Sequence, residues 1–122
     1  MILVDTSVWI DHLRSGAPLL ASVLEDGEVM MHPFVLGELA CGRLENRAET
    51  LELLAALPAA PSASEDEALA FIERRKLMGR GLGYIDVHLL ASAALGRISL
   101  WTRDKQLASV ASEMKMRFME RG

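Results

Sequence analysis

Short apolar runs separated by helical patterns constrain what this chain can fold into. Residues 2–4, 29–31 and 98–101 are apolar at nearly every position, which is typical of strands buried on both faces. The segments between these runs are long enough for helices and contain helix caps and breakers. We therefore predict an α/β fold, with a mostly parallel sheet and helices on both of its faces.

Caps and breakers define the predicted helices. Thr6 and Ser7 provide N-cap chemistry, and Ser64 with Glu67 three residues later matches a capping box. The predicted helices cover residues 8–13, 19–24, 32–41, 48–57, 65–78, 84–95 and 104–114. Residues 58–64 are predicted to be a loop or a short edge strand, and residues 116–119 are a candidate edge strand.

Length and composition indicate one globular domain over residues 1–122, with 51% hydrophobic and 25% charged residues. A single cysteine, Cys41, excludes an internal disulfide. No apolar stretch approaches the roughly 18 residues of a membrane span, and no basic segment precedes an apolar run at the start. We therefore predict a cytoplasmic protein that does not bind membranes.

Four acidic residues follow strands or lie in helices next to them. Asp5 ends the first apolar run, Asp104 follows the last one, Asp86 opens an apolar helix, and Glu38 lies in the helix predicted at 32–41. Ligands of open α/β sheets bind outside the carboxyl ends of the strands. Carboxylates gathered there repel one another unless they are protonated or bridged by a cation, and oxygen ligands suit Mg²⁺ or Mn²⁺.

Each of these acids also has a purely structural interpretation. Asp5, Asp86 and Asp104 could cap helices or sit in first turns, and Glu38 could be a solvated surface residue. The four together favour a metal site, because three of them adjoin elements that should be buried. A metal ion there would activate water against a phosphodiester, with Glu38 or Asp86 as the candidate to orient that water. The net charge of −4 does not argue against a nucleic-acid substrate, because these four acids account for all of it.

Four sequence blocks then resemble a known family. They are VDTSVWI at 4–10, GEL at 37–39, IDVHLLASA at 85–93 and TRD at 102–104, in that order along nearly the whole chain. This pattern is similar to that of PIN domains, above all the VapC toxins of bacterial and archaeal toxin–antitoxin pairs. The resemblance implies an α/β/α sandwich with about five strands, dependence on Mg²⁺ or Mn²⁺, and RNA cleavage.

The resemblance also implies residue roles and partners. The acidic tetrad of the family corresponds to Asp5, Glu38, Asp86 and Asp104, and the supporting hydroxyls to Thr6, Ser7 and Thr102. The implied partners are an RNA substrate, a cognate VapB-type antitoxin and a second copy in a homodimer. Gln106 occupies a position where many members have another acid, so the number of metal ions stays open.

Basic residues near the tetrad are candidates for binding phosphate, namely Arg43, Arg103 and Lys105. A second basic group, Arg74, Arg75, Lys76 and Arg80, is either a phosphate-binding surface or the exposed face of a charged helix. His12, His32 and His88 lack the spacing of metal ligands, so we predict structural roles for them.

Two other functions remain open at this point. Receiver-like phosphotransfer domains also gather carboxylates around Mg²⁺, but they pair two acids near the first strand, whereas Thr6 and Ser7 follow Asp5 here. A non-catalytic α/β binding module is the second alternative, which only an activity measurement separates from a nuclease. The target RNA, and whether DNA is also cut, cannot be derived from these residues.

Overall fold

The computed structural model describes residues 1–120 and contains the predicted alternation of strands and helices. Its elements, in chain order, are β1 (Ile2–Val4), α1 (Thr6–Ser15), α2 (Pro18–Glu25), β2 (Val29–Met30), α3 (Pro33–Cys41), α4 (Arg47–Ala55), α5 (Glu65–Arg75), α6 (Tyr84–Gly96), β3 (Ser99–Trp101) and α7 (Lys105–Glu113).

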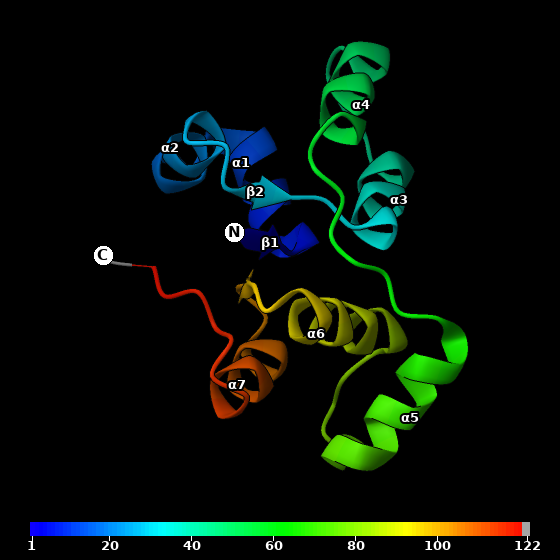
Figure 1. Cartoon of the computed structure of the whole chain (residues 1–122). Coiled ribbons are helices and arrows are strands. Elements are labelled where there is room, and N and C mark those ends of the chain that lie inside the picture. Colours follow the sequence, from blue (N-terminus) through cyan, green and yellow to red (C-terminus); the bar gives the residue numbers. More distant parts are fainter. Residues whose placement is uncertain (121–122) are drawn as a thin grey trace.

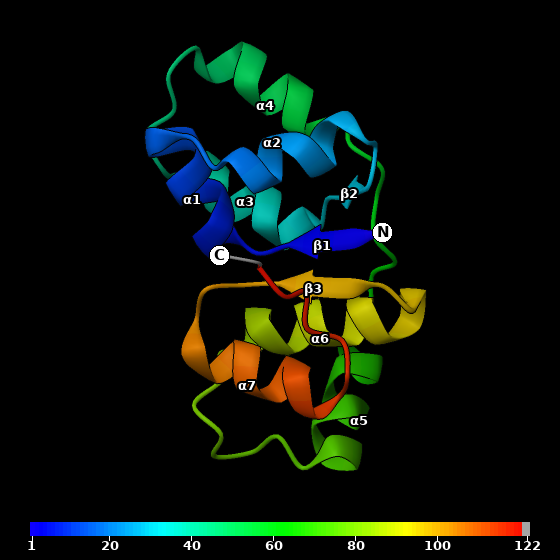
Figure 2. The same ribbon diagram turned by 90° about the vertical axis from the view of Figure 1, so that its left-hand side faces the viewer.

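The three strands form a parallel sheet in the order β2-β1-β3. Leu3 at the centre of β1 is paired with Met30 on one side and Leu100 on the other. Figures 1 and 2 show helices on both faces: α1 and α2 lie on one side of β1, α3 on the other, and α6 and α7 lie beyond β3. Helix α4 packs on α3 and α5 packs on α6. The predicted α/β/α sandwich is therefore confirmed.

The expected count of about five strands is wrong, because the sheet has three. Two flanking segments pair with it through a single residue each, as Met31 does with Ala59 and Leu100 with Arg117. Beside β2, the N–H of Met31 donates to the carbonyl of Pro58, and the N–H of Ala60 donates to the carbonyl of Met31. Proline has no N–H to donate, so a segment that contains Pro58 and Pro61 cannot extend this ladder into a regular strand.

Helix α5 ends at Arg75, three residues before its predicted end. The next residue, Lys76, has a left-handed backbone with φ of 55°, and the N–H of Leu77 donates to the carbonyl of Ile72. This is a Schellman ending, in which a hydrophobic residue just beyond the helix packs back on the core. Leu77 is buried in the core. The helix therefore ends before Leu77, although the sequence pattern predicted that it would continue to residue 78.

The core lies between the sheet and its helices. Helix α6 is buried along its middle, over residues 87–93, as its apolar sequence predicts. Trp9 and Trp101 are almost completely buried, so both belong to the core. Within the described residues, no helix has the length and apolar character needed to cross a membrane.

His32 is a buried histidine at the start of α3. Its Nδ1 accepts the N–H of Phe34 at 2.9 Å and so caps the helix, while no hydrogen-bond partner within the described residues reaches its Nε2. Burial, and secondarily the charge of the neighbouring His88, lower the pKa of His32 to about 4. The histidine is therefore neutral in the folded protein at neutral pH and has a structural role.

This lowered pKa predicts a loss of stability in mild acid. The unfolded chain binds a proton at His32 below about pH 6.5, whereas the folded chain resists it down to about pH 4. Between pH 7 and pH 5 the free energy of unfolding should fall by up to about 2 kcal/mol through this residue. Chemical denaturation at the two pH values measures the loss.

The control is His32→Asn, which keeps a side-chain acceptor at the N-cap but does not titrate. We expect this variant to lose less stability than the wild type between pH 7 and pH 5. Equal losses in the two proteins would contradict the role of His32.

Candidate metal centre

The parallel sheet brings the sequence-predicted acids to one edge. Asp5 follows β1 directly, and Asp104 lies just after β3, so both are at the carboxyl ends of neighbouring strands. The N–H of Asp5 donates to the carbonyl of Trp101 at 2.8 Å, which joins the two strand ends. Asp86 lies in the first turn of α6, which runs back from this edge, and Glu38 lies in α3.

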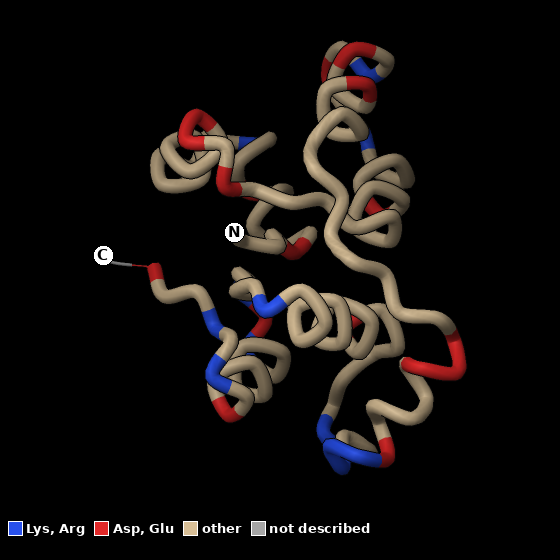
Figure 3. Tube along the Cα trace, in the orientation of Figure 1, with Lys and Arg blue, Asp and Glu red and all other residues tan. Residues whose placement is uncertain are grey.

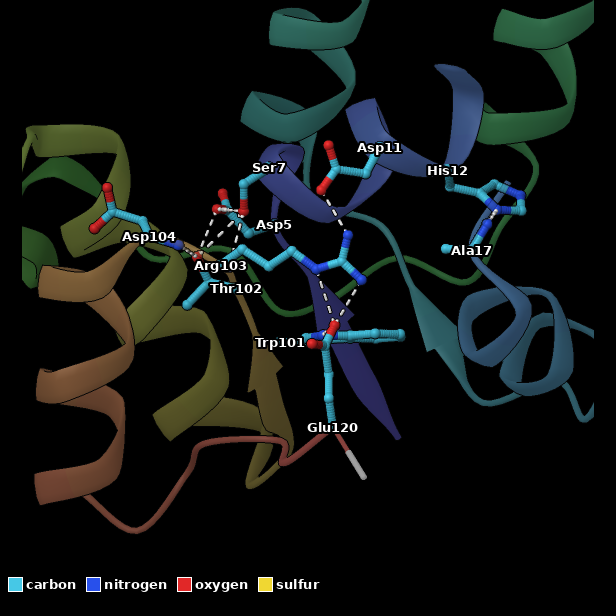
Figure 4. Close-up of polar contacts among 10 residues, drawn as sticks. All are labelled: Asp5, Ser7, Asp11, His12, Ala17, Trp101, Thr102, Arg103, Asp104 and Glu120. Atoms are coloured by element: carbon cyan, nitrogen blue, oxygen red, sulfur yellow. Dashed lines mark hydrogen bonds and ion pairs between the residues drawn. The ribbon is translucent and has the colours of Figure 1, made fainter. Parts of the chain in front are cut away.

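Asp5 is a buried carboxylate with only 7% of its surface exposed. It occupies the N-cap position of α1, but its side chain makes no cap hydrogen bond. Instead its Oδ2 accepts the hydroxyls of Ser7 at 2.7 Å and Thr102 at 2.8 Å (Figure 4). The capping interpretation therefore fails for Asp5, because two hydroxyls from different elements hold its carboxylate.

Thr102 connects Asp5 to Asp104. Its hydroxyl donates to Asp5 and accepts the N–H of Asp104 at 3.0 Å, and the threonine is itself buried. Asp104 in turn caps α7, because its Oδ1 accepts the N–H of Leu107 at 2.9 Å. Asp104 therefore has the structural role considered for it, and within the described residues no protein group donates a hydrogen bond to its Oδ2.

Asp86 has the one raised carboxyl pKa among the described residues. Burial is the main cause, and the N–H of Gly83, 3.0 Å from Oδ2, partly opposes it. The negative charges of Asp5, Asp104 and Glu38 raise the pKa further. All three of the other acids act on Asp86, so the fold does gather the tetrad in one region.

Glu38 lies at the more exposed side of this region. Its Oε1 accepts the hydroxyl of Thr6 at 2.7 Å, which ties α3 to the start of α1. Glu38 and Arg43 both line an open groove of about 690 Å³ between α1, α3 and the start of α4. A substrate in this groove would meet a carboxylate and a guanidinium together.

The tetrad fits a divalent cation by its chemistry, and it requires side-chain rotation to hold one. Its donors are all carboxylate oxygens, the ligands that Mg²⁺ and Mn²⁺ prefer. Within residues 1–120, no three His, Cys, Asp or Glu side chains are placed to hold a metal ion as they stand. Each of the four carboxylates has one oxygen turned to a protein N–H or hydroxyl, which lowers their mutual repulsion in the absence of a cation.

The three predicted phosphate-binding residues have different surroundings. Arg103 lies between two carboxylates, donating to Asp11 at 2.5 Å and to Glu120 at 2.8 Å (Figure 4). Glu120 also accepts the indole N–H of Trp101. Arg43 lines the groove beside Glu38, and Lys105 is exposed at the start of α7.

Sequence reasoning missed Asp11 and Glu120 as the partners of Arg103. A signal for Asp11 was present, because it follows Ser7 by four residues and so shares its face of α1. Ser7 accepts the backbone N–H of Arg103 at 3.0 Å, and Asp11 accepts its guanidinium one turn further on. No sequence spacing signals Glu120, which reaches Arg103 through the segment after α7.

Comparison with known proteins identifies the family. The family model described as the PIN domain matches residues 2–113, nearly the whole chain. The chain belongs to the PIN-domain family. At 50% identity over 114 residues, this PIN domain is similar to Ribonuclease VapC32 of Mycobacterium tuberculosis, a match that covers 93% of this chain and 92% of that protein.

Solved structures share the fold of this PIN domain. A toxin–antitoxin complex from Klebsiella pneumoniae superposes with a TM-score of 0.66 at 24% identity, over 88% of this chain and 91% of the other. FitAcB from Neisseria gonorrhoeae gives a TM-score of 0.63 at 20% identity, over 92% and 94% of the two chains. The predicted resemblance to VapC-type PIN domains is thereby confirmed, and the receiver-like alternative has no support.

The raised pKa of Asp86 predicts that this acid destabilises the metal-free fold. A carboxyl whose pKa is higher in the folded than in the unfolded state is unfavourable when ionised, and that cost disappears as the pH falls through the folded pKa. Asp86→Asn keeps an oxygen for the N–H of Gly83 and removes the charge. In EDTA we expect its melting temperature to exceed that of the wild type by on the order of a few degrees.

Mn²⁺ or Mg²⁺ should raise the melting temperature of the wild type and have much less effect on Asp86→Asn. Asp66→Asn, at an exposed position in the first turn of α5, is the matched control and should keep the full metal-induced shift. A lower melting temperature for Asp86→Asn in EDTA, with an unchanged metal response, would contradict the assignment.

Proposed function

We propose that this VapC-type PIN domain is a Mg²⁺- or Mn²⁺-dependent endoribonuclease, the toxin of a toxin–antitoxin pair. The observation that carries the proposal is the gathering of four carboxylates around Asp86 at the carboxyl edge of a parallel sheet. Within the described residues none of the four is in an ion pair, although other acids of the chain do pair with arginines. The 50% identity to a ribonuclease over nearly the whole chain supports RNA as the substrate.

Asp5, Glu38, Asp86 and Asp104 would hold the cation. When bound, it would offset the charge that develops on the phosphoryl oxygens and lower the pKa of neighbouring water. Ser7 and Thr102 fix the carboxylate of Asp5, so this group needs no reorganisation during the reaction. Glu38 is the more accessible acid and is held from one side by Thr6, which suits it to orient the attacking water and accept its proton.

Phosphate binding would come from the groove beside the tetrad. Arg43 lines this groove together with Glu38, and Lys105 is exposed at the start of α7. Arg103 would reach RNA only by releasing Asp11 and Glu120. We therefore propose that Arg43 and Lys105 bind the phosphates of the substrate directly. Arg103 would bind phosphate only after its ion pairs with Asp11 and Glu120 have been broken.

The remaining partners belong to the same proposal. The likeness to a VapC protein supports a VapB-type antitoxin as inhibitor. The resemblance to the VapC family further implies a homodimer as the working form and the cytoplasm as the location. Exposed apolar side chains on α5 and α6, including Leu69 and Leu95, are compatible with a surface covered by another chain. Light scattering on the purified chain decides between monomer and dimer.

The direct test is cleavage of end-labelled cellular RNA by the purified chain. We expect cutting with Mg²⁺ or Mn²⁺, none in EDTA, and a loss of at least about 100-fold in rate for Asp5→Asn, because a mispositioned metal costs several kcal/mol of transition-state stabilisation. Single-stranded DNA of matching sequence is the substrate control.

The matched protein control is Asp26→Asn, which removes an exposed acid far from the site and should cut RNA like the wild type. Metal-independent cutting, or full activity of folded Asp5→Asn, would contradict the proposal. Absence of cutting by the wild type with every divalent metal would favour the non-catalytic binding module.

A further inference from the structure

Three helices of this chain end in the same unusual way. Beyond α5, α6 and α7 the chain turns through a left-handed residue that is basic, namely Lys76, Arg97 and Lys115, with φ of 55°, 53° and 59°. Each turn is closed by a Schellman hydrogen bond from the following N–H, such as Ile98 to Ala93 and Met116 to Ala111. Glycine is the usual residue there, because a side chain makes this conformation costly.

Two of these cations line one pocket together with a third. Arg97, Lys115 and Arg75 surround a pocket of about 350 Å³, whose other lining residues are Ala94, Ile98, Ser99 and Met116. None of the described residues that line it is acidic. The pocket lies at the edge of the sheet where the strands begin, because the N–H of Ser99 donates to Met1 there. Basic segments follow the ends of α5, α6 and α7 in Figure 3.

The three cations have no carboxylate partner within residues 1–120. This contrasts with Arg80, which pairs with Glu113 at 2.5 Å, and with Arg103, which pairs with two acids. The chain has 17 acidic and 13 basic residues, so partners are abundant. A helix dipole explains one cation at each helix end, but it does not explain three cations around one pocket, where they repel one another.

Arg75 makes a cation–π contact with the protein. Its guanidinium carbon lies 5.8 Å from the centre of the Phe71 ring, and this ring is buried in the core. A guanidinium is planar, and its fork of N–H groups matches two oxygens of a phosphate. With a second guanidinium and an ammonium nearby, the pocket has the chemistry of a phosphate site.

We propose that Arg75, Arg97 and Lys115 bind backbone phosphates of the RNA substrate at the edge of the sheet opposite the carboxylates. This inference rests on the proposed ribonuclease function. Helix α6 connects the two edges, with Asp86 in its first turn and Arg97 just after its end, roughly 16 Å apart at 1.5 Å per residue. An RNA that reaches both edges is several nucleotides long. The cations bind it at the edge opposite the carboxylates, where the protein does not repel it.

The site adds affinity and leaves the chemical step alone. The carboxylate edge is acidic and, without metal, repels a polyanion, whereas the opposite edge attracts one. Contacts to phosphate carry no base information and depend strongly on salt. Losing the pocket should therefore raise KM and leave kcat at saturating RNA unchanged.

The test measures RNA binding in EDTA, by fluorescence anisotropy of a labelled hairpin of about 20 nucleotides, over a series of salt concentrations. For Arg97→Gln/Lys115→Gln, the slope of log affinity against log salt should become shallower by about 1.5, and affinity at low salt should drop on the order of 10-fold. Arg97→Lys should keep the wild-type slope, because it retains the charge.

Lys76→Gln is the matched control, since it removes a cation from the same left-handed position of α5 without lining the pocket. We expect it to bind like the wild type. The three substituted positions are exposed, and circular dichroism verifies the fold of each variant. Wild-type affinity and slope in the double variant, or an equal loss in Lys76→Gln, would overturn the proposal.

Cleavage by the wild type separates this inference from the function on which it rests. If the wild type cuts RNA with metal and the double variant matches it in KM, the pocket has no role in binding RNA, and the ribonuclease function stands. If the double variant loses affinity in EDTA while the wild type cuts nothing with any metal, the phosphate site stands and the catalytic function fails.

Discussion

The buried carboxylate of Asp5 is the constraint on which the site depends. A carboxylate taken out of water needs hydrogen bonds or a cation, and here Ser7 and Thr102 supply two hydroxyls to one of its oxygens. These hydroxyls come from the start of α1 and from the end of β3, so the same contacts join two neighbouring strand ends. Thr102 also accepts the N–H of Asp104, which places the second acid beside the first.

The remaining acids add repulsion to this arrangement. Asp86 is partly buried, and the negative charges of the other three acids raise its pKa. Its ionised form is therefore disfavoured in the metal-free fold. The chain tolerates this cost because the acids are anchored by helix starts and backbone N–H groups, such as that of Gly83. A cation at this edge removes the repulsion, so metal binding and stability are coupled. The site costs stability without metal, which is typical of functional sites.

Charge is distributed unevenly between the two edges of the sheet. Within the described residues the four acids of the carboxyl edge have no basic partner, and Arg103 beside Asp104 is paired with Asp11 and Glu120. At the opposite edge lie cations that have no acidic partner among residues 1–120, where Arg97 and Lys115 follow α6 and α7. A net charge of −4 hides this separation, which explains why composition alone does not decide whether such a chain binds nucleic acid.

Local patterns predicted most of this architecture. The apolar runs, caps and breakers placed every helix and all three strands, because each of these signals acts through neighbours in sequence. The extra strands were wrong because only one residue of each flanking segment, Ala59 or Arg117, pairs with the edge of the sheet. The acids were found from their positions after strands. The partners of Arg103 depend on contacts across 92 and 17 residues, and only Asp11 had a local signal.

A crystal structure of the protein with Mn²⁺, with an anomalous difference map, tests the central claim most directly. We predict one strong peak or more at the carboxyl edge of the sheet, with oxygens of Asp5, Glu38, Asp86 and Asp104 as ligands at about 2.0–2.3 Å. The side chain of Asp86 should have rotated away from the N–H of Gly83 or bind through its other oxygen. A map without a peak there at millimolar Mn²⁺, with the four carboxylates hydrogen-bonded as in the metal-free fold, would contradict the account.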